Sequence, residues 1–165
     1  MKKISKKLAQ YYLWLLAKIT LWHYKPSIIA VTGSTWRHPV KEEIFKNLHD
    51  QFKIRMSPKN YNAEIGVPLS ILGLSSESSS KLNWLKLLLF EAVKRALFDK
   101  NFPEKLILEL AIDSPRDMDY LTALIKPEIV VITNITSEYL DNFGSLDEIA
   151  KEYTKLIKVV LPGGL

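Results

Sequence analysis

Apolar residues follow two kinds of spacing along this chain. Short continuous apolar runs between turn residues are typical of buried strands, and an apolar residue every three or four positions is typical of a helix packed on one face. Strands are predicted at 27–31, 52–56, 105–110 and 127–132. Helices are predicted at 40–50, 66–72, 81–100, 117–125 and 145–158. Because strands alternate with helices, the pattern predicts an α/β fold in three layers, with a mainly parallel sheet flanked by helices.

The first 25 residues form a separate predicted segment, in which lysines precede the apolar stretch Leu8 to Ala17. This order superficially resembles a signal peptide, but Lys18 interrupts the stretch and no small-residue cleavage site follows. The stretch is also too short to span a bilayer. We expect a basic amphipathic helix over 1–25 that packs on the protein or on a partner. Peripheral contact with an anionic membrane surface and a cleaved signal are the alternatives. The expected location is cytoplasmic.

Composition narrows the possible chemistry. The 165 residues suit one domain, and the lack of cysteine excludes disulfides, thiol catalysis and cysteine-based zinc sites. The net charge of +5 favours an anionic partner, although part of the excess lies in the first seven residues. Nucleic acid is not a predicted partner, because the sequence has neither a helix-turn-helix pattern nor aromatic residues interleaved with the basic ones.

The turn after the first strand has the setting of a phosphate-binding loop. Such a loop uses small residues, so that backbone N–H groups can surround a phosphate at a helix N-terminus, and a lysine and a Ser or Thr to bind the last phosphate and magnesium. Gly33, Ser34 and Thr35 suit this role. The positions of the second glycine, the lysine and the first hydroxyl residue hold Trp36, Arg37 and His38. Taken alone, the segment is typical of an ordinary turn between a strand and a helix.

Five segments, in order, resemble motifs of the Mur ligase central domain, a P-loop-type fold. Residues 29–34 with 40–42 are similar to AVTGSxGKTxxKE, and residues 60–69 to NYNNEIGVPL. Residues 108–110 with 113–121 resemble LEMGxDxPGDMDYL. Residues 126–135 and 137–145 resemble KPDIVVTNI and SxHLExFGS. The likeness covers 26–165 and is greatest to the members that add D-alanyl-D-alanine to a muramyl tripeptide.

The resemblance implies ATP-dependent amide formation in cell-wall precursor synthesis, with Mg²⁺ as a second cofactor and a UDP-muramyl peptide as substrate. The implied nucleotide site is Gly33, Ser34, Thr35, Arg37 and His38. Glu109 matches the family's magnesium-binding glutamate, with a metal-free carboxylate at a strand end as the alternative. Asn60 and Asn62 match residues near the UDP-sugar, with capping of a loop as the alternative.

Several positions depart from the family motifs, so no catalytic residue is predicted. Trp36 adds bulk to the loop, and the planar guanidinium of Arg37 is a poor substitute for lysine. Tyr139 stands at the family's histidine. Tyr153 stands at its carbamylated lysine, unless the alignment is off by one turn toward Lys151 or Lys155.

We therefore expect an incomplete central domain that is inactive alone. The family's C-terminal domain and N-terminal UDP-binding domain are not expected in this chain. The alternatives are half of a split ligase, completed by a separate chain with the missing C-terminal domain, and a non-catalytic scaffold.

Overall fold

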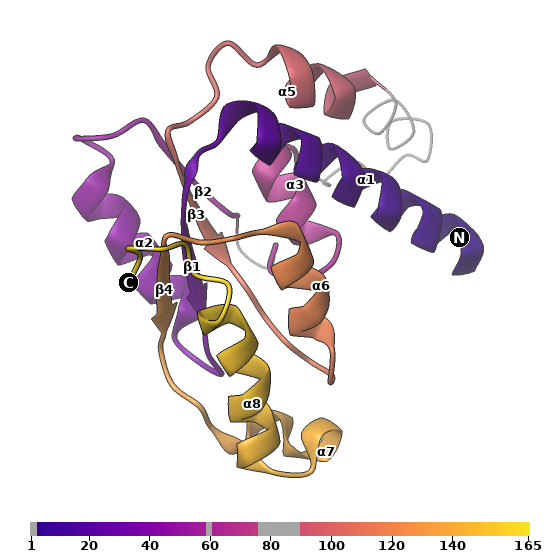
Figure 1. The fold of residues 1–165 in the computed structure, drawn as a ribbon, viewed down its shortest axis with the longest axis vertical. Helices are drawn as coiled ribbons and strands as arrows, with labels where there is room; N and C mark the ends of the chain where they lie inside the picture. Colours follow the sequence, from indigo (N-terminus) through magenta and orange to yellow (C-terminus); the bar gives the residue numbers. More distant parts are fainter. Residues whose placement is uncertain (1–2, 59–60, 76–89) are drawn as a thin grey trace.

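The computed structural model describes residues 3–58, 61–75 and 90–165, and the side chains from Lys7 onward in that range. Four parallel strands form one sheet in the order β2-β3-β1-β4 (Figure 1). Their bounds are β1 Ser27–Thr32, β2 Ile54–Met56, β3 Lys105–Glu109 and β4 Ile129–Ile132. Ala30 in the central strand pairs with Leu108 on one side and Val130 on the other. The predicted parallel sheet is therefore confirmed.

Helices cover both faces of the sheet. They are α1 Lys3–Tyr24, α2 Arg37–Leu48, α3 Gly66–Leu72, α5 Ala92–Phe98, α6 Asp117–Leu124, α7 Leu140–Phe143 and α8 Leu146–Ile157, with a 3-10 turn η2 at Ser137–Tyr139. Figure 1 shows α2 on one side of the sheet and α3, α6 and α8 on the other. The predicted helix 81–100 is described only from residue 90 onward, and Asn60 lies outside the described residues.

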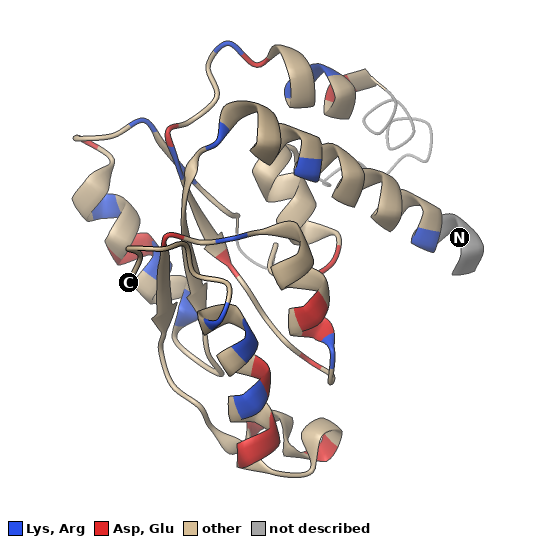
Figure 2. Cartoon of the chain, in the orientation of Figure 1, with Lys and Arg blue, Asp and Glu red and all other residues tan. Residues whose placement is uncertain are grey.

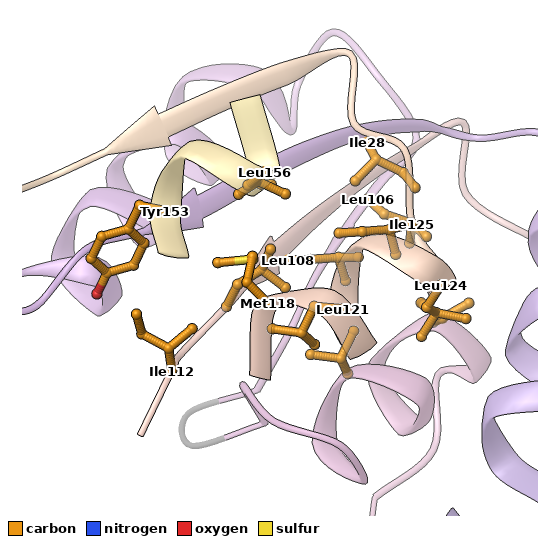
Figure 3. Close-up of a cluster of buried hydrophobic side chains, with 14 of the residues drawn as sticks. Ile28, Leu106, Leu108, Ile112, Met118, Leu121, Leu124, Ile125, Tyr153 and Leu156 are labelled. Atoms are coloured by element: carbon orange, nitrogen blue, oxygen red, sulfur yellow. The ribbon is translucent and has the colours of Figure 1, made fainter. Parts of the chain in front are cut away.

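Side chains from successive strand residues enter different clusters, as the period of two in a strand requires. Ile29, Val31 and Ile107 pack with residues of α2. Ile28, Leu106 and Leu108 face the other way and meet apolar residues of α6 and α8 (Figure 3). The same alternation fixes which strand-end residues lie near α2, and it therefore positions the site described below.

Helix α1 packs one face on the domain. Leu13, Leu16 and Ala9 are buried against residues of α3 and α5. The opposite face is open: the exposed fractions are 66% for Leu8, 65% for Tyr11, 41% for Leu15 and 75% for Trp22. Within the described residues, no helix is long and apolar enough to cross a membrane.

Candidate functional site: the loop after the first strand

The candidate site lies where three parallel strands end. Thr32, Glu109 and Ile132 are the last residues of β1, β3 and β4. Ligands of open α/β sheets bind at this carboxyl edge. The loop 33–36 leads from β1 into α2 there, and the segment 133–136 follows β4 alongside it.

Side-chain and backbone hydrogen bonds fix the first half of the loop to the segment after β4. The Ser34 N–H donates to the Asn134 carbonyl over 2.9 Å, and the Thr35 N–H donates to Asn134 Oδ1 over 2.9 Å. A Cβ added to Gly33 would lie 2.2 Å from Thr133 Oγ1, so this close approach requires glycine. The N–H groups of Ser34 and Thr35 are thus used within the protein.

The second half of the loop has free backbone donors. Among the described residues, the N–H groups of Trp36, Arg37 and His38 donate no hydrogen bond, and no side chain caps the N-terminus of α2. Unpaired N–H groups at the start of a helix carry partial positive charge and favour an anion. This part of the loop keeps the donors that a phosphate would need.

Trp36, at the position of a glycine in the resembled motif, has a backbone conformation that is typical of glycine. Its φ is 65°, in the left-handed region, and its indole is 69% exposed. Only glycine adopts this conformation without a steric cost. Arg116, with φ 79°, also stands at a glycine of the resembled motif. Both residues therefore form a turn at the expense of backbone strain.

The Arg37 side chain turns back toward its own loop. Its Nη1 donates to the Gly33 carbonyl and, over 2.6 Å, to the Ser34 carbonyl. Burial opposes the charge, but interaction with the Tyr139 hydroxyl and with Glu109 outweighs burial, and the pKa of Arg37 is raised. Arg37 Nε is buried, makes no hydrogen bond within the described chain and lies 3.7 Å from Glu109 Oε1.

Glu109 ends β3 and has both carboxylate oxygens engaged. Oε2 accepts from Lys41 Nζ at 2.8 Å, and Oε1 accepts from Asn62 Nδ2 at 3.1 Å. Burial alone would raise the pKa of Glu109. The hydrogen bond and charge of Lys41 outweigh this effect, with help from Asn62 and Arg37, and the pKa of Glu109 lies below its usual value of 4.5. The carboxylate therefore stays charged and paired.

Lys41 is the residue of the site that the sequence predictions did not include. It is fully buried on α2, with Ser57 Oγ at 3.4 Å and the Pro58 carbonyl at 3.5 Å as further acceptors. It follows Arg37 by four positions, so both side chains lie on one face of the helix. Two signals for Lys41 were available in the sequence: this spacing, and the match of Lys41 to the lysine in the last two letters of the motif AVTGSxGKTxxKE.

Tyr139 and Tyr153 both lie beside the loop. Tyr153, on α8, is 1% exposed, and its hydroxyl has no hydrogen-bond partner among the described residues. In Figure 3 its oxygen points away from the apolar cluster. Burial raises the pKa of Tyr153 to about 12, although nearby Ser34 and Arg37 oppose the shift.

The neighbouring lysines of α8 have other partners. Lys151 pairs with Glu148 at 2.6 Å, and Lys155 bridges Asp119 and Glu152 at 2.8 Å each. Tyr153 is thus the residue of this turn that faces the loop.

The polar groups around Glu109 do not suit a magnesium ion. Mg²⁺ requires free oxygen ligands in octahedral geometry. Here the carboxylate is surrounded by Lys41 Nζ, Arg37 Nε, Asn62 Nδ2 and, at 4.0 Å, His38 Nδ1. No group of three or more His, Cys, Asp or Glu that could hold a metal occurs in the described ranges. The donor set fits an anion instead.

Comparisons with known proteins agree with the fold. The sequence profile of the Mur ligase middle domain matches residues 31–165. UDP-N-acetylmuramoyl-tripeptide–D-alanyl-D-alanine ligase from Borreliella burgdorferi is 30% identical over 129 residues, which are 78% of this chain and 22% of that protein. The Bacillus subtilis enzyme of the same name is 25% identical over 150 residues, 91% of this chain and 27% of its own length.

Solved structures show the same architecture. MurF from Acinetobacter baumannii superposes with a TM-score of 0.72 at 21% identity, covering 94% of this chain and 29% of that one. MurF from Thermotoga maritima, solved in complex with ADP, gives a TM-score of 0.69 at 24% identity, covering 92% and 30%. This chain spans about a quarter of the length of these curated relatives.

Proposed function

Because this chain belongs to the Mur ligase family through its middle domain, we propose that it binds the phosphates of an adenine nucleotide at the loop 33–38. One observation carries the proposal: the free N–H groups of Trp36, Arg37 and His38 begin an uncapped helix directly after a parallel strand. Helix N-termini in this setting bind phosphate. The Thermotoga maritima MurF structure, solved in complex with ADP, supports the choice of nucleotide.

Thermal unfolding with and without ADP tests this function. A ligand that binds only the folded chain stabilises it by about 2.7 kcal/mol at one hundred times its dissociation constant, so ADP should raise the melting temperature. Adenosine is the matched control, because it lacks the phosphates that the loop would hold. An unchanged melting temperature with ADP, for a chain shown to be folded, would contradict the proposal.

We further propose that this chain alone does not form the amide bond that its relatives' names describe. In the resembled motif the loop lysine neutralises charge on the transferred phosphate. Catalysis of phosphoryl transfer depends mainly on such charge stabilisation and on positioning of the reactants. Here Arg37 stands at that position and bonds to the loop's own carbonyls. Incubation with ATP, a UDP-muramyl tripeptide and D-alanyl-D-alanine should give no product, and any product formed would disprove this point.

A role in peptidoglycan precursor synthesis would need further domains, from the same polypeptide or from a separate chain, because the relatives are about three and a half times as long. We propose the split arrangement as the alternative to a non-catalytic scaffold. Pull-down from the native cell followed by the ligation assay separates these two possibilities. A complex that forms the ligation product supports the split ligase, and a stable complex without ligation supports the scaffold.

The open face of α1 favours a second binding role, at an anionic membrane surface. Leu8, Tyr11, Leu15 and Trp22 lie three, four and seven positions apart, on one side of the helix. The helix has no acidic residue, and Figure 2 shows basic positions along it. Apolar and aromatic residues beside lysines are typical of interfacial helices. The chain should co-sediment with vesicles containing phosphatidylglycerol, and Trp22→Ala should weaken this binding. Equal binding to neutral vesicles would show that the lysines of α1 do not contribute.

A further inference from the structure

We infer that this site binds its phosphate ligand without a divalent metal ion, because Lys41 supplies within the protein the positive charge that a metal would bring. The inference rests on the proposed function. It starts from Glu109, which matches the metal-binding glutamate of the family and whose carboxylate lies 3.7 Å from Arg37 Nε and 4.0 Å from His38 Nδ1.

The carboxylate of Glu109 is already neutralised. Lys41 Nζ lies 2.8 Å from Oε2, and the pair is almost fully buried, with exposed fractions of 0% for Lys41 and 4% for Glu109. A metal ion at Oε2 would have to displace the ammonium group or lie against it. Like charges at such a distance repel strongly where water is excluded. In this structure Lys41 therefore occupies the Oε2 side of the carboxylate.

The second carboxylate oxygen is protected in the same way. Asn62 donates to Oε1, and Arg37 Nε lies 3.7 Å from it. Both neighbours are hydrogen-bond donors, and neither group offers a lone pair to a metal. The hydroxyl residue that would follow the loop lysine in the resembled motif is His38 in this chain.

What remains unpaired at the site is a set of buried polar atoms. Three buried side-chain atoms have no hydrogen-bond partner among the described residues: Arg37 Nε, His38 Nδ1 and Tyr153 Oη. The first two lie within 4.0 Å of Glu109, and Tyr153 is near enough to Arg37 and Ser34 for both to influence its pKa. Unpaired buried polar atoms are costly, and an anion with several oxygens would satisfy them together with the N–H groups of residues 36–38.

Charge balance points to the class of ligand. With Glu109 neutralised by Lys41 and Nη1 of Arg37 bonded to the loop carbonyls, Nε of Arg37 is the charged donor that stays available to a phosphate. One cation and several neutral donors suit the terminal phosphate of a diphosphate better than a triphosphate, which normally needs a metal to offset its charge. We therefore expect ADP to bind more tightly than ATP.

Calorimetric titration of the wild-type chain with ADP, in EDTA and again in excess Mg²⁺, tests the inference. The dissociation constant in excess Mg²⁺ should be no lower than in EDTA, because Mg²⁺ also binds ADP in solution. A metal that helped to hold the anion would lower it by about fivefold or more, the lower end of ordinary coupling between ligands. Such a magnesium-dependent gain would overturn the inference and leave the proposed function intact. Absence of ADP binding in both buffers would overturn both.

Substitution of Lys41 tests the cause. Lys41→Met frees Glu109, so Mn²⁺ binding measured by electron paramagnetic resonance should appear, and ADP binding should become metal-dependent. Lys46→Met is the matched control, because Lys46 lies on the same helix with a side chain 66% exposed. If Lys41→Met does not fold, the double variant Lys41→Met/Glu109→Gln removes both charges and should still bind ADP in EDTA. Mn²⁺ binding by the wild-type chain at Glu109 would contradict the assignment.

Discussion

The ammonium group of Lys41 lies 2.8 Å from Oε2 of Glu109, and water reaches almost none of either side chain. The contact joins α2 to the end of β3, two elements that are 68 residues apart at these positions. It also links the start of the loop helix to the strand end that borders the site. The pair therefore has a structural role as well as the proposed role in shaping an anion site.

Breaking this buried pair should destabilise the fold. Glu109→Gln leaves the Lys41 charge without its partner, and loss of one partner of a buried pair costs about 3–5 kcal/mol. Urea denaturation measures the free energy of unfolding. Glu43→Gln is the matched control: Glu43 pairs with Lys46 at 3.6 Å on the exposed side of α2 and should cost less than about 1 kcal/mol. Equal losses in the two variants would contradict the structural role of the pair.

The contribution of Glu109 to stability should depend on pH. Its pKa in the folded chain lies below 4.5, mainly because Lys41 favours the charged form against burial. The stabilisation is therefore complete above the unfolded pKa and is lost as the pH falls through the folded pKa. The stability difference between wild type and Glu109→Gln should shrink as pH decreases below 4.5. A difference that stays constant would show that the carboxylate charge is not responsible.

Restoring glycine at the two left-handed positions should stabilise the chain. A left-handed backbone costs a residue other than glycine about 1–2 kcal/mol, part of which the greater freedom of glycine in the unfolded chain offsets. Trp36→Gly and Arg116→Gly should each raise the free energy of unfolding by up to about 1 kcal/mol. Trp36→Ala is the control, because alanine keeps the strain. The same gain for alanine as for glycine would assign the effect to the lost indole.

Removing the Tyr153 hydroxyl should separate stability from binding. A buried polar atom without a partner costs about 1–3 kcal/mol, so Tyr153→Phe should leave the free energy of unfolding unchanged or higher. ADP affinity should fall, because the phosphate loses a donor. Tyr120→Phe is the comparison: its hydroxyl donates to the Glu64 carbonyl at 2.9 Å, away from the loop, so stability should decrease and ADP affinity should not change. Destabilisation by Tyr153→Phe without loss of affinity would refute the assigned role.

The sequence predicted the sheet because its strands are buried on both faces and leave continuous apolar runs, as in 27–31 and 105–110. It overestimated β2, which begins at Ile54 rather than at Phe52. Helix α2 begins at Arg37 rather than at Val40, since proline is compatible with the first turn, where its missing N–H is not needed.

The site was predicted less completely than the fold. The resembled motif led us to predict the loop, Glu109 and the two tyrosines as site positions. Lys41 was not predicted, although it lies within the motif, because a lysine on a helix is ordinarily solvated. Its burial depends on Ser57 and Glu109, which come from other elements. The left-handed backbone conformation at Trp36 was not predicted either, because tryptophan seldom adopts it.

The measurement that tests this account most directly is the change in backbone amide signals of the ¹⁵N-labelled chain when ADP is added in EDTA. The N–H groups of Trp36, Arg37 and His38 are free and should shift most. Those of Ser34 and Thr35 already donate to Asn134 and should shift less. Shifts that appear only after Mg²⁺ is added, or that fall mainly on residues away from the loop, would contradict a metal-free phosphate site.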